Sequence, residues 1–204
     1  MSRSGLGSNG RNVAVLLGVS LPLALGCVLY LENAGADDAH LVSLLTLTAR
    51  IAFMIYLLIF VARPLRQLMP NDLTKWLLSE RRSLGIAFAA VHTVHLGLIF
   101  TRHDIESLLD RPLIGTAVGA TAYLLMYLML LTSFDAPARR LGPKNWRRLH
   151  KTGLYFIGFV FFATLLPEPG QAVYTFDRAW LYALTGIAVF IRLTAWFAAR
   201  RNRR

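Results

Sequence analysis

The sequence contains one cysteine and few acidic residues, and both shortages restrict what the protein can be. With Cys27 alone, the chain can form no internal disulfide and can hold no cysteine-ligated iron–sulfur cluster. Only 11 Asp and Glu residues stand against 22 Lys and Arg residues, which gives a formal net charge of +11. On a soluble protein such an excess would point to nucleic acid, so the placement of the charges decides what they mean.

The sequence also lacks the motifs that bind nucleotides or flavins. It has no glycine-rich phosphate loop, and the connections between its apolar runs are too short to form a flavin or nicotinamide domain. This sequence therefore cannot take hydride from NAD(P)H by itself. Any electrons that it carries are expected to come from a partner flavoprotein or from a membrane quinol.

What the sequence does have is long apolar runs, since 55% of its residues are hydrophobic. Runs of about 18–22 residues, at about 1.5 Å per residue, can cross a ~30 Å hydrocarbon core. We predict an all-α integral membrane bundle of six helices that forms one domain over residues 1–204. The predicted spans cover residues 12–31, 41–62, 83–101, 113–133, 149–166 and 179–199.

The charged residues alternate between the connections. Basic residues gather at both ends of the chain and in the connections around Arg63–Arg82 and Arg139–Lys151, whereas the acids, Asp38 and Asp104 among them, lie mostly in the other connections. By the positive-inside rule, this pattern places both termini in the cytoplasm. A basic cytoplasmic face also suits anionic lipid, which explains the net charge better than nucleic acid does.

The first span has an alternative interpretation as a signal peptide. Arg3 and Arg11 precede it, and Ala34-Gly35-Ala36 matches a small-residue cleavage site. Its apolar run is longer than the core of about 7–15 residues that is typical of signal peptides. We therefore expect an uncleaved helix, while cleavage would leave five spans in the same orientation.

Glycine and proline residues mark expected contacts and breaks. Gly115 and Gly119 have the small-residue spacing that lets membrane helices approach closely, so they predict helix packing. Leu65–Leu78 is expected to be interfacial, with Pro64, Pro70 and Trp76 breaking or anchoring it. Pro137 and Pro143 are expected to break the connection between the fourth and fifth spans.

Histidines at membrane depth are the most informative residues. His92 and His95 are three residues apart and share one face of the third span, and His150 lies at the start of the fifth. Ionisable side chains at such depth are costly and usually functional. Neutral imidazoles from two helices can ligate a haem iron. The sequence therefore predicts one haem b, with His150 paired with either His92 or His95 as its axial ligands.

The depths of these histidines differ. His150 lies about two residues from the basic flank, whereas His95 lies about thirteen residues beyond Arg82, which is roughly 20 Å at helical rise. A tilted third span would close part of this difference. Otherwise His95 binds haem alone or with another ligand.

Two arginines lie within the predicted spans. Arg50 is near the middle of the second span, where no acid within the spans can neutralise it. A haem propionate, a polar cavity or a lipid phosphate would account for its charge, so we include it in the cofactor-binding set. Arg192 lies about two turns from the inner end of the sixth span and is expected to extend to the interface.

Two other classes of protein remain open at this point. A haem-free membrane scaffold would bind nothing with these histidines, and a small metal transporter would use them as transient ligands. A transporter is expected to show broken helices or an internal repeat, and the sequence shows neither.

Several segments resemble the ferric-reductase-like transmembrane domain family over about residues 40–200. Arg81–Gly85 followed by His92–Leu96 resembles its third helix, and Thr48-Ala49-Arg50 resembles part of its second. Leu141-Gly142, Trp146 and Arg148-Leu149-His150 resemble its fifth. Within this family, the chain looks most like the haem-binding membrane subunits of bacterial periplasmic methionine-sulfoxide reductase systems.

The resemblance implies an electron-transfer subunit of a bacterial inner membrane. Such a subunit takes electrons from a quinol or flavoprotein donor and passes them through haem to an acceptor protein at the outer, periplasmic face. The resemblance matches His95 to the family's haem ligand in the third helix and His150 to its first haem ligand in the fifth helix. Those subunits carry a second fifth-helix histidine where this chain has Ala163, so the resemblance implies one haem here.

Overall fold

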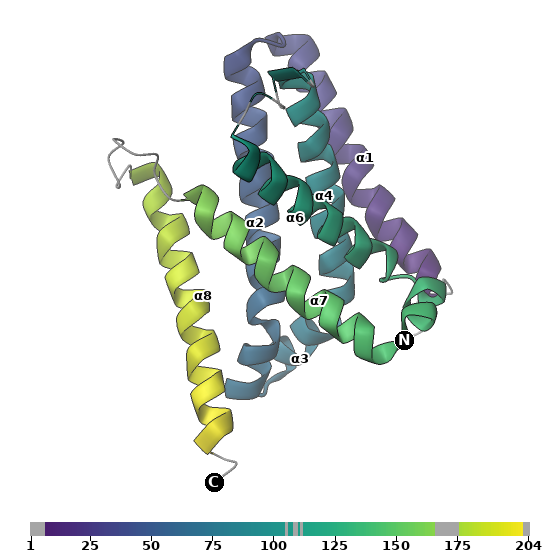
Figure 1. Cartoon of the computed structure of the whole chain (residues 1–204), viewed down its shortest axis with the longest axis vertical. Coiled ribbons are helices and arrows are strands. Elements are labelled where there is room, and N and C mark those ends of the chain that lie inside the picture. The colour runs from purple at the N-terminus through teal and green to yellow at the C-terminus, as the bar shows by residue number, and fades with distance from the viewer. Residues whose placement is uncertain (1–6, 105, 108–109, 111, 166–175, 202–204) are drawn as a thin grey trace.

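The computed structural model describes residues 7–104, 106, 107, 110, 112–165 and 176–201, and every regular element in them is a helix. The predicted all-α class is therefore confirmed for the described part of the chain. In chain order (Figure 1), the helices are α1 (Ser8–Ala34), α2 (Asp38–Leu68), α3 (Asp72–Ser79), α4 (Arg81–Arg102), α6 (Leu113–Leu131), α7 (Asp135–Leu165) and α8 (Phe176–Arg201).

Five helices are long and apolar enough to cross a membrane, namely α1, α2, α4, α6 and the part of α8 from Ala179. They correspond to five of the six predicted spans. The other predicted span, 149–166, lies in α7 apart from Leu166, which is outside the described residues. Since α7 is not among the five, the count of six spans stays a prediction.

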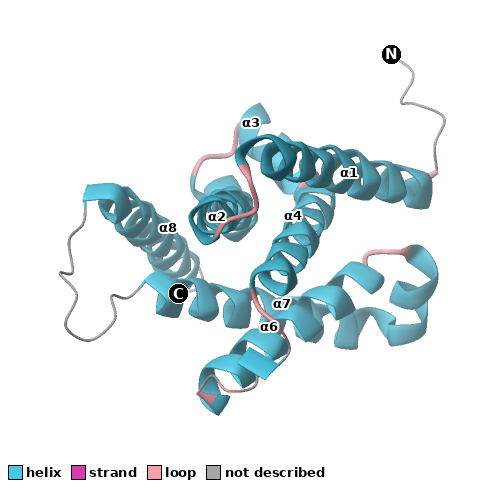
Figure 2. Ribbon diagram, turned by 90° about the horizontal axis from the view of Figure 1, so that it is seen from above, coloured by secondary structure: helices cyan, strands magenta, loops and turns pink. Residues whose placement is uncertain are grey.

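The helices pack around α2 and α4. Helix α4 contacts α1 on one side and α2 on the other, and α8 packs against α2. Helices α6 and α7 form an antiparallel pair that crosses in front of α2 and α4 in Figure 1. Because α6 contacts α4 while α7 contacts α2 and α8, this pair covers one side of the bundle (Figure 2).

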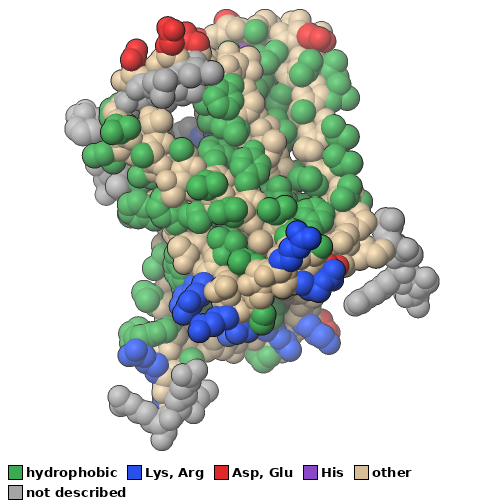
Figure 3. Space-filling model, turned by 45° about the vertical axis from the view of Figure 1, so that its right-hand side comes forward, with side chains coloured by type: hydrophobic (Ala, Val, Ile, Leu, Met, Phe, Trp, Pro, Cys, Tyr) green, Lys and Arg blue, Asp and Glu red, His purple; other side chains and the backbone are tan. Residues whose placement is uncertain are grey.

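Charged side chains separate along the long axis of the bundle. On the face shown in Figure 3, most Lys and Arg side chains gather near one end and most acidic ones at the opposite end, with a hydrophobic belt between them. We call these the basic end and the acidic end. Helix α2 starts at the acidic end with Asp38 and reaches the basic end with Arg66. This separation is what the alternating charges of the sequence predict.

Pro64 does not interrupt α2, which continues to Leu68. Proline has no backbone N–H, so the Phe60 carbonyl loses its usual partner within the helix. Arg192 of α8 replaces that partner, since its Nη1 donates to the Phe60 oxygen at 2.7 Å. The Nε and Nη2 atoms of Arg192 donate to the Tyr155 hydroxyl of α7 at 3.1 and 2.9 Å. The expectation that Arg192 extends to the interface was wrong, because its guanidinium joins three helices instead.

Helix α7 consists of two helical segments that meet at a kink. Gly142 has φ 76° and ψ 158°, a left-handed conformation that glycine adopts at little cost. Pro143 follows it as the first residue of the second segment. A backbone N–H at that position would have no partner within the helix, so its absence from proline costs no hydrogen bond. The predicted break at Pro143 is therefore confirmed, whereas Pro137 lies in the first turn of α7 and breaks nothing.

The second segment of α7 packs closely on α2 at Gly158. The Tyr56 hydroxyl of α2 donates to the Leu154 carbonyl at 3.1 Å, and a Cβ at Gly158 would overlap that hydroxyl. Tyr56 is only 5% exposed, so its ring has little room to move. Gly158 thus sets how near α7 lies to α2.

Gly158→Ala is therefore expected to lower the free energy of unfolding by about 1–3 kcal/mol, the usual cost of overpacking a filled core. Thermal unfolding of the purified protein, followed by circular dichroism, measures the loss. In Gly153→Ala, the added Cβ meets the flexible Met129 thioether, so a smaller loss is expected. Tyr56→Phe should partly rescue Gly158→Ala. Equal losses at both glycines, with no rescue, would contradict this account.

Candidate functional site

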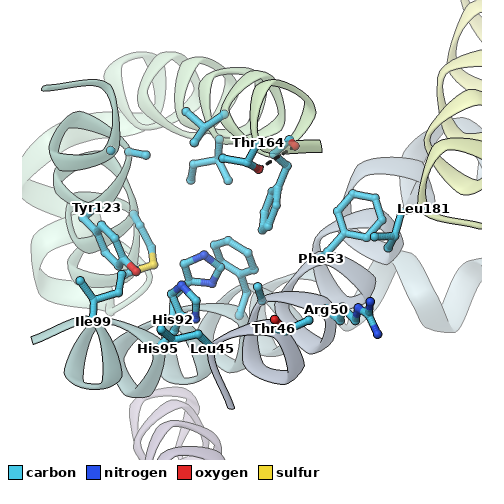
Figure 4. Close-up of a pocket in the computed structure, with 18 of the residues that line it drawn as sticks. Leu45, Thr46, Arg50, Phe53, His92, His95, Ile99, Tyr123, Thr164 and Leu181 are labelled. Atoms are coloured by element: carbon cyan, nitrogen blue, oxygen red, sulfur yellow. Dashed lines mark hydrogen bonds between the residues drawn. The ribbon is translucent and has the colours of Figure 1, made fainter. Parts of the chain in front are cut away.

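A cavity of about 500 Å³ lies between α2, α4, α6, α7 and α8 (Figure 4). Its size falls within the range of about 300–1,000 Å³ that is usual for ligand pockets. Most of the wall is apolar or aromatic, as shown by Val42, Leu45, Ala49, Phe53, Phe88, Ile99, Ala122, Tyr123, Met126, Ile157, Val160, Phe161 and Leu181. Such a wall excludes water and strengthens any polar contact made inside it.

Two imidazoles reach this cavity from α4, where the three-residue spacing of His92 and His95 places both on one helix face. Their ring centroids are 5.6 Å apart. The His92 ring packs against Phe88 at 4.5 Å and edge-to-face against Phe161 at 5.6 Å. Its Nδ1 atom is buried and has no hydrogen-bond partner among the described residues. A buried polar atom without a partner is costly, and it is often explained by a missing ligand.

The His95 ring, in contrast, is bound to α2. Its Nδ1 lies 2.8 Å from the Thr48 Oγ1. Thr48 is completely buried where α2 packs on α4. This contact holds one edge of the His95 ring against α2, while the side chain still lines the cavity.

Arg50 and Arg102 bring positive charge to the cavity wall. Arg102 forms a two-bond ion pair with Asp38, with distances of 2.6 and 3.1 Å, at the acidic end. The Arg50 guanidinium carbon lies 5.9 Å from the centre of the Trp180 ring on α8. Figure 4 shows the Arg50 side chain directed away from the two imidazoles.

The sequence did not single out Arg102 as a site residue, because the predicted third span ends at residue 101. Helical periodicity would have found it. Arg102 follows His95 by seven residues, so the two lie on the same face of α4 about two turns apart. The sequence therefore contained this spacing, but Arg102 lies one residue beyond the predicted third span and was not considered with it.

His150 lies away from the cavity and does not line it. Its ring stacks on Trp146 with centroids 4.0 Å apart, and its Nε2 is 3.0 Å from the Thr132 Oγ1. The Trp146 Nε1 donates to the Thr132 carbonyl at 2.9 Å. These contacts join α7 to the residue that follows α6. The structure thus brings His92, His95 and Arg50 to one cavity and leaves His150 outside, and the ligand pairing stays a prediction.

The small residues of α6 open the cavity. Gly119 lines it, and a Cβ built on either Gly115 or Gly119 would meet no described atom within 4 Å. The expected close packing of another helix at these glycines is therefore absent from the described part of the chain. At Gly119, the missing side chain leaves room for a ligand.

The donor set suits a particular kind of ligand. Among the residues that the structure describes, no three His, Cys, Asp or Glu side chains gather into a site for a metal ion. The cavity offers imidazole nitrogens, an aromatic wall, two guanidinium groups and the hydroxyls of Thr46, Tyr123 and Thr164. This combination fits a large, flat, apolar ligand that presents a metal to an imidazole and carries anionic groups at its edge.

Comparison with known proteins finds relatives with one shared name. The chain is 31% identical over 147 residues to a protein of Cronobacter sakazakii, a match that covers 68% of this chain and 70% of that protein. It is 39% identical over 83 residues to one of Azospira oryzae, covering 37% of this chain and 35% of the relative. A Ralstonia nicotianae protein is 34% identical over 96 residues, covering 43% and 42%.

All three are named protein-methionine-sulfoxide reductase haem-binding subunit MsrQ. No family model and no solved structure matches the chain, so the wider ferric-reductase-like family stays a prediction. The apolar helices and these relatives identify a multi-pass protein of the bacterial inner membrane. Because the similarity to the Cronobacter protein extends over more than two thirds of that protein, this chain belongs to the MsrQ family.

Proposed function

We propose that this chain is a transmembrane b-type cytochrome. It would hold one haem b in the cavity and pass electrons from a quinol or flavoprotein donor to an acceptor at the outer face. The observation that carries this proposal is the pair of imidazoles, His92 and His95, on the wall of a largely apolar cavity inside an apolar helix bundle. The haem-binding subunits among its relatives support the choice of ligand.

The residues of the cavity fit this group. A haem iron is commonly bound by a neutral imidazole nitrogen, and two imidazoles are present, one of which has an unpartnered buried Nδ1. When bound, haem b supplies one-electron chemistry that no side chain of the cavity provides. The protein's part is to hold the imidazoles, to pack the ligand between Phe88, Tyr123 and Phe161, and to exclude water.

Arg50 and Arg102 support the same ligand through their charge. Both line the cavity, and Arg102 lies at the acidic end of the bundle, where it pairs with Asp38. Guanidinium groups bind carboxylates through strong, charge-assisted hydrogen bonds. We propose that they favour the carboxylate edge of the cofactor, with Arg102 balanced in part by Asp38.

For the axial ligand we favour His95, with His92 beside it. His150 would have to leave Thr132 and Trp146 before it could reach the cavity. A haem bound through His150 would therefore need a second site near the basic end. The single site at His92 and His95 agrees with the one-haem prediction from Ala163.

The topology that goes with this function has six spans and both termini in the cytoplasm. The fifth of these spans, which completes the five membrane-length helices to six, is the apolar part of α7, residues 149–165, and the basic end of the bundle is the cytoplasmic end. The donor then acts from the cytoplasm or the membrane. The relatives' names favour a methionine-sulfoxide reductase as the acceptor protein, and in this topology it would act at the outer, periplasmic face.

A reduced-minus-oxidised spectrum with a pyridine haemochrome assay tests the proposal directly. Protein purified folded from haem-replete cells is expected to show a Soret band and about one haem b per chain. Colourless folded protein would reject the cytochrome and leave the haem-free scaffold. Reversible metal binding without porphyrin would favour the transporter, although no cluster of metal ligands occurs in the described residues.

A further inference from the structure

Thr48 lies at the contact between α2 and α4, on the side of His95 that faces away from the cavity. Its side chain is completely buried, and its Oγ1 is 2.8 Å from the His95 Nδ1. The same oxygen lies 2.8 Å from the Leu44 carbonyl and 3.1 Å from the Leu45 carbonyl. The hydroxyl is thus surrounded by two acceptors and one imidazole nitrogen.

The single proton of the Thr48 hydroxyl connects these contacts. A threonine hydroxyl has one proton and two lone pairs. A threonine inside a helix commonly donates to the carbonyl four residues back, and the Leu44 carbonyl lies 2.8 Å from Oγ1. In that arrangement the Thr48 oxygen accepts from His95, which puts the proton of a neutral ring on Nδ1. The lone pair of His95 is left on Nε2, the ring nitrogen that does not face Thr48.

His92 has no equivalent support. Its Nδ1 is buried without a hydrogen-bond partner among the described residues. Its ring packs against Phe88, Tyr123 and Phe161 and lies beside the His95 ring. Packing restricts the tilt of an imidazole but does not select which nitrogen carries the proton. The two histidines therefore differ in how well they are prepared to bind a metal.

We propose that Thr48 is a positioning residue, which fixes the Nδ1–H tautomer and the ring orientation of His95 and so presents Nε2 as the metal-binding nitrogen. Histidines that bind metals usually donate their other N–H to a protein oxygen in this way. The inference rests on the proposed function and deepens it, because it selects one of the two histidines and one of its nitrogens.

The first experiment measures the tautomer without any cofactor. Full-length chain labelled with ¹⁵N-histidine and purified without haem reports the protonation of each ring nitrogen by NMR. Unaltered protein and Thr48→Ser, which keeps the hydroxyl, are expected to show the Nδ1–H form of His95. Thr48→Val is expected to show a mixture of both tautomers, because it removes the acceptor.

Thr46→Val is a matched control. Thr46 lies two residues away on α2 and also lines the cavity, but its hydroxyl donates only to the Val42 carbonyl, at 2.8 Å. This variant therefore removes the same oxygen from the same helix without touching His95, and it should leave the tautomer unchanged. An unchanged His95 tautomer in Thr48→Val would overturn the inference.

The second experiment measures haem binding by the same variants. Loss of a group that orients a metal ligand typically lowers affinity by about 10–100-fold. A loss of this size is expected for Thr48→Val, and a smaller one for Thr46→Val, whose side chain lines the cavity but does not contact His95. The midpoint potential of the haem that remains should rise, since the imidazole becomes a weaker donor. Equal losses in Thr46→Val and Thr48→Val would overturn the role of Thr48. Unaltered protein that binds no haem would reject the proposed function itself, while the NMR result would still report on the hydrogen bond.

Discussion

His95→Ala is expected to purify with at least about tenfold less haem than the unaltered chain. Removing the axial ligand itself should lower haem affinity more than removing the residue that orients it. His92→Ala should lose less haem and shift the absorption spectrum, since its ring packs beside His95 with centroids 5.6 Å apart. Pyridine haemochrome content per folded chain measures both effects. His40→Ala, which changes a histidine at the start of α2, controls for general effects of removing an imidazole.

His150→Ala is expected to keep its haem. The structure gives His150 other partners, since Trp146 covers its ring and Thr132 lies 3.0 Å from its Nε2. Removing the imidazole should therefore loosen the junction between α6 and α7 and lower the melting temperature. It should not empty a cavity that His150 does not line.

The opposite outcome for His150 would be equally informative. If His150→Ala lost its haem as completely as His95→Ala while remaining folded, then the pairing across the third and fifth spans would hold. Helix α7 would then have to move when haem binds, so that Thr132 and Trp146 release the ring. Loss of haem from His150→Ala alone would move the site to the basic end of the bundle.

The sequence predicted the helices and part of the site, and the reasons are local. Apolar runs and alternating charge depend only on neighbouring residues, so five of the six predicted spans correspond to membrane-length helices. The spacing of His92 and His95 likewise fixes a shared face, whatever surrounds it. Arg50 reaches the same cavity because its helix packs against α4.

What the sequence could not show depends on contacts between helices. The role of Thr48 appears only when α2 and α4 are packed and its hydroxyl meets His95. The spacing of Gly115 and Gly119 is compatible with a packed neighbouring helix or with open space. In the folded structure, a Cβ at either glycine would meet no described atom within 4 Å, and Gly119 lines the cavity. Proline likewise predicts a break at Pro64 only if nothing replaces its missing hydrogen bond, and Arg192 does replace it.

Arg192 replaces the hydrogen bond to the Phe60 carbonyl that Pro64 cannot make, so removing Arg192 is expected to have a second large effect. Arg192→Met keeps the length and apolar stem of the side chain but removes the donors to Phe60 and Tyr155. The Phe60 carbonyl would then have no partner, because Pro64 cannot supply one. This carbonyl is part-buried, so its loss of a partner should cost about 1 kcal/mol, the lower end of the range for a buried unsatisfied acceptor. The cation also lies 4.2 Å from the centre of the Phe60 ring, a contact that adds to the expected loss.

A double-mutant cycle separates these effects. Pro64→Ala restores the backbone N–H that the Phe60 carbonyl lacks, so Arg192→Met should cost about 1 kcal/mol less in the Pro64→Ala background than in the unaltered chain. Thermal or denaturant unfolding of the four proteins in one detergent provides the measurement. Arg200→Met is the matched control, because Arg200 lies over the Trp196 ring on the same helix and has no partner on α2 among the described residues. Additive losses in the cycle would show that Arg192 does not satisfy the carbonyl freed by Pro64. Its place between α2 and α7 would then have to be explained by the contacts with the Phe60 and Tyr155 rings.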